Sequence, residues 1–303
     1  MPRTHDRQSF FKYMPATTAR AVLATRSLRW SSPLLFNDPF DVPRKLSFGI
    51  TPQQLVEAST RYIAQLIQHP PTDTKHLSAK LQLIVEAAKK GNAPEVQKLL
   101  LAGLEEGTPN PTSTSESMDE LRVMWSNSVP DLRILCLTES PAHTAMWYHY
   151  AHRYAGVVIE FRCNEHTDSP WLFARPVDYP EGKPAVYTAE GWAELLVLDT
   201  NVAVRRLLDI AMYTKSRDWA YENEWRIVTF KRPNDYGHFT DYPFHADDLA
   251  AIYLGPLMSD DDKREVLKLL VAFPHARALF VSLSLSRDFV FNEAGGYGSG
   301  ALS

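Results

Sequence analysis

The side chains best suited to chemistry lie in one short stretch, residues 215–230, which reads KSRDWAYENEWRIVTF. Its second half alternates in the manner of a β-strand. If the strand begins just before Glu222, then Glu222, Glu224 and Arg226 project from one face, because strand side chains have a period of two. Trp225 projects from the opposite face, and we predict that it is buried in the core.

Two carboxylates and a guanidinium on one strand face allow two interpretations. They could form a solvated sheet edge, held by ion pairs across neighbouring strands. They could instead form a site in which Arg226 orients a carboxylate that binds a hydroxyl group or stabilises a developing positive charge. The second interpretation makes Glu224 and Glu222 the candidate catalytic residues.

The same stretch permits a metal-dependent reaction. Lys215 and Asp218 precede the two glutamates, and together these four residues could form the site of a metal-dependent nuclease. Such an enzyme would require a divalent metal ion.

Other potential metal ligands show no familiar spacing. His143, His149 and His152 fall in one segment, but no cysteine or carboxylate completes a known ligand pattern. We therefore expect exposed helix histidines and no metal site. Cys136 and Cys163 lie in or beside apolar, strand-like runs, which predicts buried, reduced thiols and no disulfide framework.

The composition is that of an ordinary globular protein. The 303 residues are 45% hydrophobic and 22% charged, with a formal net charge of −4. This charge argues against non-specific binding to nucleic acid or to an anionic membrane. The N-terminus has no apolar signal core, and no run is long enough to span a membrane, so a cytoplasmic location is expected.

The order of predicted elements indicates one mixed α+β domain over residues 1–303, with a largely antiparallel sheet. Strands are predicted at residues 10–13, 28–31, 132–138, 157–161, 225–230, 250–254 and 278–285. Helices are predicted at residues 16–26, 145–154, 188–198, 201–213 and 259–273. A helical insertion is predicted at 51–127, with a surface loop at 105–117 because that segment is rich in Thr, Ser, Pro and Gly.

Three passages resemble a bacterial family of domains without an assigned function. They contain FNDPF at residues 36–40, MWxxYA at 146–151 and ExEWR at 222–226. A more distant similarity is to the ADP-ribosyltransferase superfamily. It consists of a strand, helix and strand at the N-terminus, a strand unit with aromatic and hydroxyl side chains in the middle, and a late Glu-x-Glu at the start of a strand. The resemblance implies two small split sheets with a cleft that binds NAD as a substrate.

The resemblance also assigns roles to individual residues. Glu224 corresponds to the glutamate that stabilises the oxocarbenium ion formed as nicotinamide leaves, and Glu222 corresponds to the acceptor-side glutamate. Tyr13 or Lys12 would stand where the first-strand residue that binds NAD belongs, and Thr138, Trp147 and Tyr150 fall near the middle motif. By their charge alone, Arg226, Lys12 or Arg29 could neutralise the pyrophosphate of NAD. The first strand carries Lys-Tyr where the superfamily has Arg or His, and no Ser-Thr-Ser follows.

The expected function is therefore ADP-ribosyl transfer or NAD hydrolysis, in a toxin or a phage-defence effector. The acceptor, whether protein, nucleic acid or water, is left open. No glycine-rich phosphate loop is present, which argues against a Rossmann or P-loop enzyme. A nucleotide-binding regulatory module on the same fold is the alternative from a different functional class.

Overall fold

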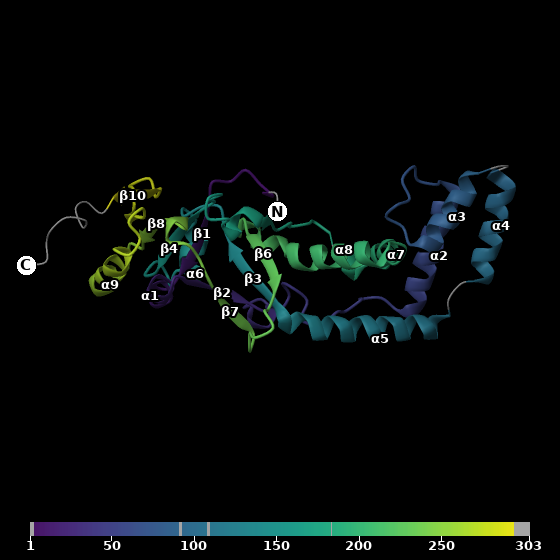
Figure 1. Ribbon diagram of the computed structural model, residues 1–303, viewed down its shortest axis with the longest axis horizontal. Coiled ribbons are helices and arrows are strands. Elements are labelled where there is room, and N and C mark those ends of the chain that lie inside the picture. Colours follow the sequence, from purple (N-terminus) through teal and green to yellow (C-terminus); the bar gives the residue numbers. More distant parts are fainter. Residues whose placement is uncertain (1–2, 91–92, 108–109, 183, 294–303) are drawn as a thin grey trace, which may run out of the picture. The chain divides into compact units, whose positions relative to one another are not determined.

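The computed structural model describes residues 3–90, 93–107, 110–182 and 184–293, and its elements are drawn in Figure 1. The chain folds into two compact units. Unit 1 consists of Met1–Leu35, Asp131–Val177 and Asp218–Ser303. Unit 2 consists of Phe36–Pro130 and Asp178–Arg217. Within the described residues no helix has the length and apolar character needed to cross a membrane.

Unit 1 is built on two five-stranded sheets. The first has the order β1-β4-β8-β9-β10 and the second the order β5-β6-β3-β2-β7. Every pairing is antiparallel except that of β8 with β9. The strands are β1 Ser9–Met14, β2 Ser27–Ser31, β3 Leu132–Leu137, β4 Val157–Arg162, β5 Arg175–Pro176, β6 Trp225–Phe230, β7 Phe239–Pro243, β8 Leu249–Leu254, β9 Arg277–Leu283 and β10 Phe289–Glu293. The predicted α+β class with largely antiparallel sheets is confirmed.

Three α-helices cover these sheets. They are α1 Ala16–Thr25, α6 Thr144–Tyr150 and α9 Asp260–Leu270. Helices α1 and α9 pack against each other, as Figure 1 shows. Neighbouring residues of β1 point to opposite faces of the sheet and pack in different hydrophobic clusters. Phe10 packs in the cluster that contains residues of α1 and α9, and Phe11 packs in the cluster that contains residues of α6. The first sheet is therefore covered on both faces.

Helix α6 is shorter than the predicted helix at 145–154. It ends at Tyr150, and the next turn contains three consecutive non-glycine residues with positive φ: His152 at 47°, Arg153 at 51° and Tyr154 at 70°. Gly156 follows this turn and lies directly against β1. A Cβ atom there would lie 2.3 Å from the carbonyl oxygen of Met14, so the strand β1 approaches too closely for a side chain.

A second glycine, Gly255, lets the chain after β8 pack on this turn. Its N–H donates to the carbonyl of Gly156, and a Cβ atom on Gly255 would lie 2.2 Å from the carbonyl oxygen of Tyr154. Gly255→Ala is expected to lower the free energy of unfolding by about 1–3 kcal/mol, because the backbone must shift to accept the methyl group.

Urea denaturation of Gly255→Ala beside Gly103→Ala measures this effect. A Cβ atom on Gly103, in a helix of unit 2, meets nothing within 4 Å, so the control variant should be neutral or slightly stabilised. Equal midpoints for the two variants would show that the close approach at Gly255 has no energetic consequence.

Unit 2 is helical. Its helices are α2 Pro52–Gln68, α3 Ala79–Lys89, α4 Ala93–Glu106, α5 Pro111–Ser128, α7 Ala189–Leu196 and α8 Thr200–Tyr213. Helix α2 contacts α3, α4, α5 and α7. It begins with a reciprocal capping box between Thr51 and Gln54, and Pro52 stands in its first turn. The helical character predicted for residues 51–127 is confirmed, and α7 and α8 join the same unit from a later segment.

The surface loop predicted at 105–117 is wrong for residues 105–106 and 111–117, which are helical, while residues 108–109 lie outside the described residues. Helix α4 continues to Glu106, and α5 already begins at Pro111. The side chain of Asn110 accepts a hydrogen bond from the backbone N–H of Ser113, and the proline stands where a helix needs no N–H donor. Ser and Thr in the first turns of α5 thus belong to a capped helix, although their composition resembles that of a loop.

Candidate functional site

The segment that carries Glu222 and Glu224 is a turn and not an extended strand. Residues Arg217–Glu222 form a 3-10 helix, Asn223 has a φ of 43°, and β6 begins only at Trp225. The strand predicted at 225–230 is confirmed, and the extended conformation considered from just before Glu222 does not occur. Asparagine is one of the few residues that adopts the left-handed region readily, and this was the signal in the sequence that could have revealed the turn.

Both glutamates are buried, with exposed fractions of 3% for Glu222 and 4% for Glu224, while Asn223 between them is exposed. The interpretation as a solvated sheet edge is wrong for this reason. A carboxylate is buried only where hydrogen bonds or an opposite charge compensate for the loss of water.

Glu224 is compensated by Arg226, which is itself completely buried. Arg226 Nε donates to Glu224 Oε1 at 2.7 Å, and a terminal nitrogen of the guanidinium donates to Glu224 Oε2 at 2.9 Å. This two-bond geometry is the strongest form of an arginine–carboxylate contact. Arg226 thus engages both carboxylate oxygens and fixes the orientation of Glu224.

Glu222 has a different kind of partner. The hydroxyl of Tyr150, the last residue of α6, donates to Glu222 Oε1 at 2.6 Å. Burial raises the pKa of Tyr150 well above its usual value, and the neighbouring Glu222 charge raises it further. The hydroxyl therefore stays neutral and acts as the hydrogen-bond donor to Glu222.

Thr138 holds this turn where the two sheets of unit 1 meet. Its backbone exchanges two hydrogen bonds of 2.9 Å with Phe11 of β1, which links the end of β3 to the first sheet. Its hydroxyl donates to the backbone carbonyl of Glu222 at 2.6 Å. Thr138 thus fixes the position of Glu222 through the backbone.

Lys12 lies beside the same cluster. Its ammonium donates to the carbonyl of Cys136 at 2.6 Å, and Cys136 pairs with Arg226 across β3 and β6. Burial, and then the Glu224 carboxylate, raise the pKa of the Cys136 thiol. Cys136 was not among the predicted site residues, because nothing in the sequence places β3 beside β6.

Two stacked aromatic rings lie next to Glu222. The rings of His143 and Tyr221 stack with their centres 5.6 Å apart. Burial lowers the pKa of His143, which is half-buried, and Nδ1 of this ring has no hydrogen-bond partner among the described residues. His149 and His152 are exposed, as predicted, whereas His143 is not, because its ring packs on Tyr221.

Two further predicted residues belong to the hydrophobic core. Trp147 is completely buried, donates from Nε1 to the carbonyl of Pro141, and packs edge-on against Tyr13. The hydroxyl of Tyr13 donates to the carbonyl of Ser140 at 2.9 Å and accepts from the backbone N–H of His143. These two rings support α6 and the loop before it.

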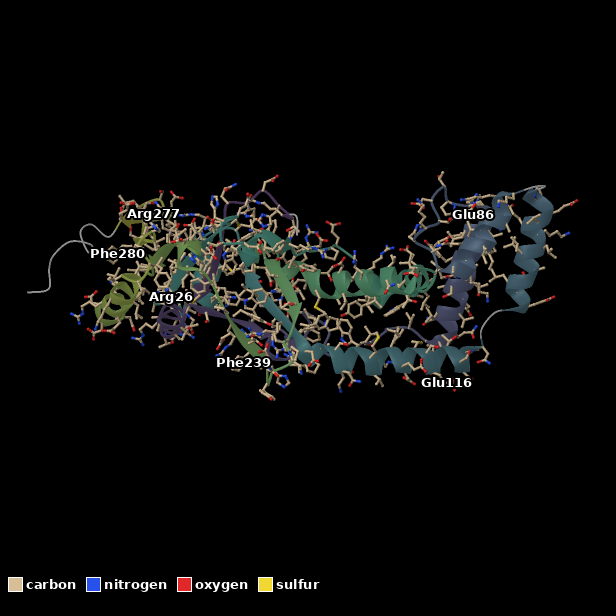
Figure 2. The ribbon with its side chains drawn as sticks, in the orientation of Figure 1. Arg26, Glu86, Glu116, Phe239, Arg277 and Phe280 are labelled. Atoms are coloured by element: carbon tan, nitrogen blue, oxygen red, sulfur yellow. The ribbon has the colours of Figure 1, made fainter. Side chains whose placement is uncertain are left out.

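Arg29 and Trp225 are placed differently from the expectation. Arg29 is exposed on β2, where it forms two hydrogen bonds to Asp241 and covers the ring of Phe239, which is labelled in Figure 2. The structure therefore does not bring Arg29 to the glutamates. Trp225 is only half-buried because it is the first residue of β6, and its Nε1 donates to the carboxylate of Glu139.

The metal-dependent interpretation gains no geometric support. In the described parts of the chain no group of three or more His, Cys, Asp or Glu side chains is arranged to hold a metal ion. Lys215 forms an ion pair with Asp41 inside unit 2.

Comparison with known proteins gives one partial match. Residues 146–227 match a family model described as a protein of unknown function, DUF2971. The matched interval runs from α6 into β6, so it contains Tyr150, both glutamates and Arg226. Searches of the curated proteins and of the solved structures gave no significant match. The expectation of an uncharacterised domain family is supported, and the match assigns no activity.

Proposed function

We propose that this chain cleaves the bond between nicotinamide and ribose in NAD and transfers ADP-ribose to an acceptor. The observation that carries the proposal is the pair of buried carboxylates at the junction of two small sheets: Glu222 bound by Tyr150, and Glu224 bound by Arg226. Their position directly before a strand agrees with the resemblance to the ADP-ribosyltransferases.

The chemistry requires a fixed negative charge. When the glycosidic bond breaks, nicotinamide leaves with the bonding electron pair and the ribose gains positive charge, which a preorganised carboxylate stabilises. Glu222, whose Oε1 accepts from the Tyr150 hydroxyl, is the candidate for this role, because both oxygens of Glu224 already face a guanidinium. We therefore assign Glu222 to the ribose and Glu224 to a positioning role through Arg226 and the intervening turn.

The cation suited to the NAD pyrophosphate is Lys12. It is half-buried, and it forms no ion pair with any described residue. The exposed Asn223 and the half-buried rings of His143 and Tyr221 surround Glu222 and would meet the nicotinamide nucleoside. The acceptor is protein, nucleic acid or water, and the setting that we propose is a toxin or a phage-defence effector in the cytoplasm.

The burial of both carboxylates favours a second candidate, a module that binds a nucleotide without turning it over. An exposed fraction of 3–4% restricts access of a substrate to these groups. Such a module would use the same residues to recognise NAD or ADP-ribose.

Isothermal titration with NAD and ADP-ribose, together with measurement of nicotinamide release, separates the two candidates. We expect NAD to bind and nicotinamide to be released. If NAD binds but no nicotinamide is released, whether the acceptor supplied is water, protein or nucleic acid, the chain is a binding module. If NAD and ADP-ribose do not bind and no nicotinamide is released, both candidates are refuted.

A further inference from the structure

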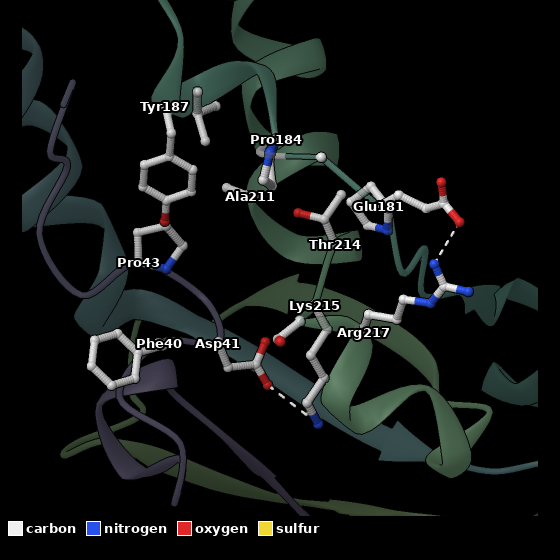
Figure 3. Close-up of a pocket in the computed structure, with 14 residues that line it drawn as sticks. Phe40, Asp41, Pro43, Glu181, Pro184, Tyr187, Ala211, Thr214, Lys215 and Arg217 are labelled. Carbon is white, nitrogen blue, oxygen red and sulfur yellow. Dashed lines mark hydrogen bonds and ion pairs between the residues drawn. The ribbon is translucent and has the colours of Figure 1, made fainter. Parts of the chain in front are cut away.

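Unit 2 contains a cavity that the proposed reaction does not use. Its volume is about 360 Å³, within the range of about 300–1,000 Å³ typical of small-molecule sites. The lining comes from three parts of this unit: residues 40–43, residues 180–182 with 184–187, and residues 211–217, which include the end of α8 and the segment after it. Figure 3 shows the cavity with its lining side chains.

One end of the cavity carries two opposite charges. Asp41 Oδ2 lies 3.7 Å from Lys215 Nζ, and the two side chains have exposed fractions of only 5% and 7%. Both line the cavity and lie side by side in Figure 3. A carboxylate and an ammonium in this arrangement present an acceptor and a donor next to each other.

The remaining lining is mixed: the Glu181–Arg217 ion pair and the polar residues Thr214 and Ser216 lie among proline, aromatic and aliphatic side chains. Phe40, Pro43 and Tyr187 lie along one side, and Pro184 and Ala211 lie at the end away from the charges (Figure 3). Burial raises the pKa of Tyr187, so its hydroxyl is neutral at physiological pH. The flat proline and aromatic side chains on one side suit a planar ring whose polar edge faces Asp41 and Lys215.

We propose that this cavity binds a guanine base. One edge of guanine combines an oxygen acceptor, O6, with two neighbouring donors, N1–H and N2–H. Lys215 would donate to O6, and the Asp41 carboxylate would accept from the two N–H groups, since one carboxylate can accept two parallel hydrogen bonds. The planar base would lie against the proline and aromatic side chains.

Other ligand classes fit this pair less well. Adenine also presents an acceptor, a ring nitrogen, beside an N–H donor, but it offers the carboxylate one hydrogen bond where guanine offers two. A free amino acid would bring two more charges into the cavity, and each would have to lose its water. Guanine is neutral, and it bridges the acceptor and the donor without adding a charge.

Isothermal titration of the full chain with GMP tests the proposal, with AMP and 1-methyl-GMP as comparison ligands. All three carry the same ribose and phosphate, so differences between them report on the base. We expect GMP to bind at least about 10-fold more tightly than AMP. The affinity of 1-methyl-GMP should also be about 10-fold lower than that of GMP, because 1-methyl-GMP lacks the N1–H donor. Absence of GMP binding at millimolar concentration, or equal affinity for GMP and AMP, would overturn the proposal.

A paired substitution tests the assigned residues. Asp41→Asn with Lys215→Met removes both charges together, so neither is left buried alone. It should weaken GMP binding at least about 100-fold, as expected for the loss of the hydrogen bonds to charged groups. The matched control removes another ion pair of unit 2, the partly exposed Arg206–Glu194 pair, by Glu194→Gln with Arg206→Met.

The control variant should bind GMP as the parent does. Unchanged GMP affinity in the Asp41/Lys215 variant would refute the assignment. If that variant fails to fold in a thermal melt, the comparison of GMP with 1-methyl-GMP on the parent chain decides, because the methyl group blocks only the edge assigned to Asp41.

Discussion

Glu224→Gln is expected to lower the free energy of unfolding by about 3–5 kcal/mol, the range for removing one partner of a buried ion pair. Arg226 is completely buried and directs two nitrogens at Glu224. The substitution leaves its positive charge facing a neutral amide in a place that excludes water. Urea denaturation of parent and variant measures the effect through the shift of the midpoint at constant slope.

A double variant shows whether the charge is responsible. Glu224→Leu with Arg226→Met removes both charges and keeps most of the side-chain volume, and such replacements are often neutral or stabilising. We expect it to be more stable than Glu224→Gln. A single variant as stable as the parent would mean that the pair is not buried in solution.

Much of the fold could be predicted from the sequence because local signals agreed with the tertiary structure. Thr51-Pro52 predicts the start of α2, and Ser259 with the acidic residues after it predicts the start of α9; both caps are present. The apolar run at 132–137 became the central strand β3. The start of α5 was predicted to be part of a loop, because Ser, Thr and Pro are common both in loops and in the first turn of a helix.

The candidate site could be predicted only in part. The clustering of Glu222, Glu224 and Arg226 is visible in the sequence, and the structure keeps them together. Their burial is not visible, because it depends on Tyr150 and Thr138, which approach from distant segments. Arg29 was included on residue type alone, and its pairing with Asp241 follows from the register of β2 with β7.

The central claim is that the charge of Glu222 promotes cleavage of NAD, and one comparison tests it most directly. Glu222→Gln keeps the shape of the side chain and removes its charge. The matched control is Glu160→Gln, because Glu160 also accepts a hydrogen bond from a tyrosine hydroxyl in unit 1, that of Tyr253 at 2.8 Å. Thermal melts check that both variants are folded.

The measurement is the rate of nicotinamide release from NAD by parent, Glu222→Gln and Glu160→Gln. Loss of one preorganised electrostatic group costs about 10²–10³ in rate, so we expect this reduction for Glu222→Gln and parent-like release for Glu160→Gln. Parent-like release by a folded Glu222→Gln variant would contradict the account.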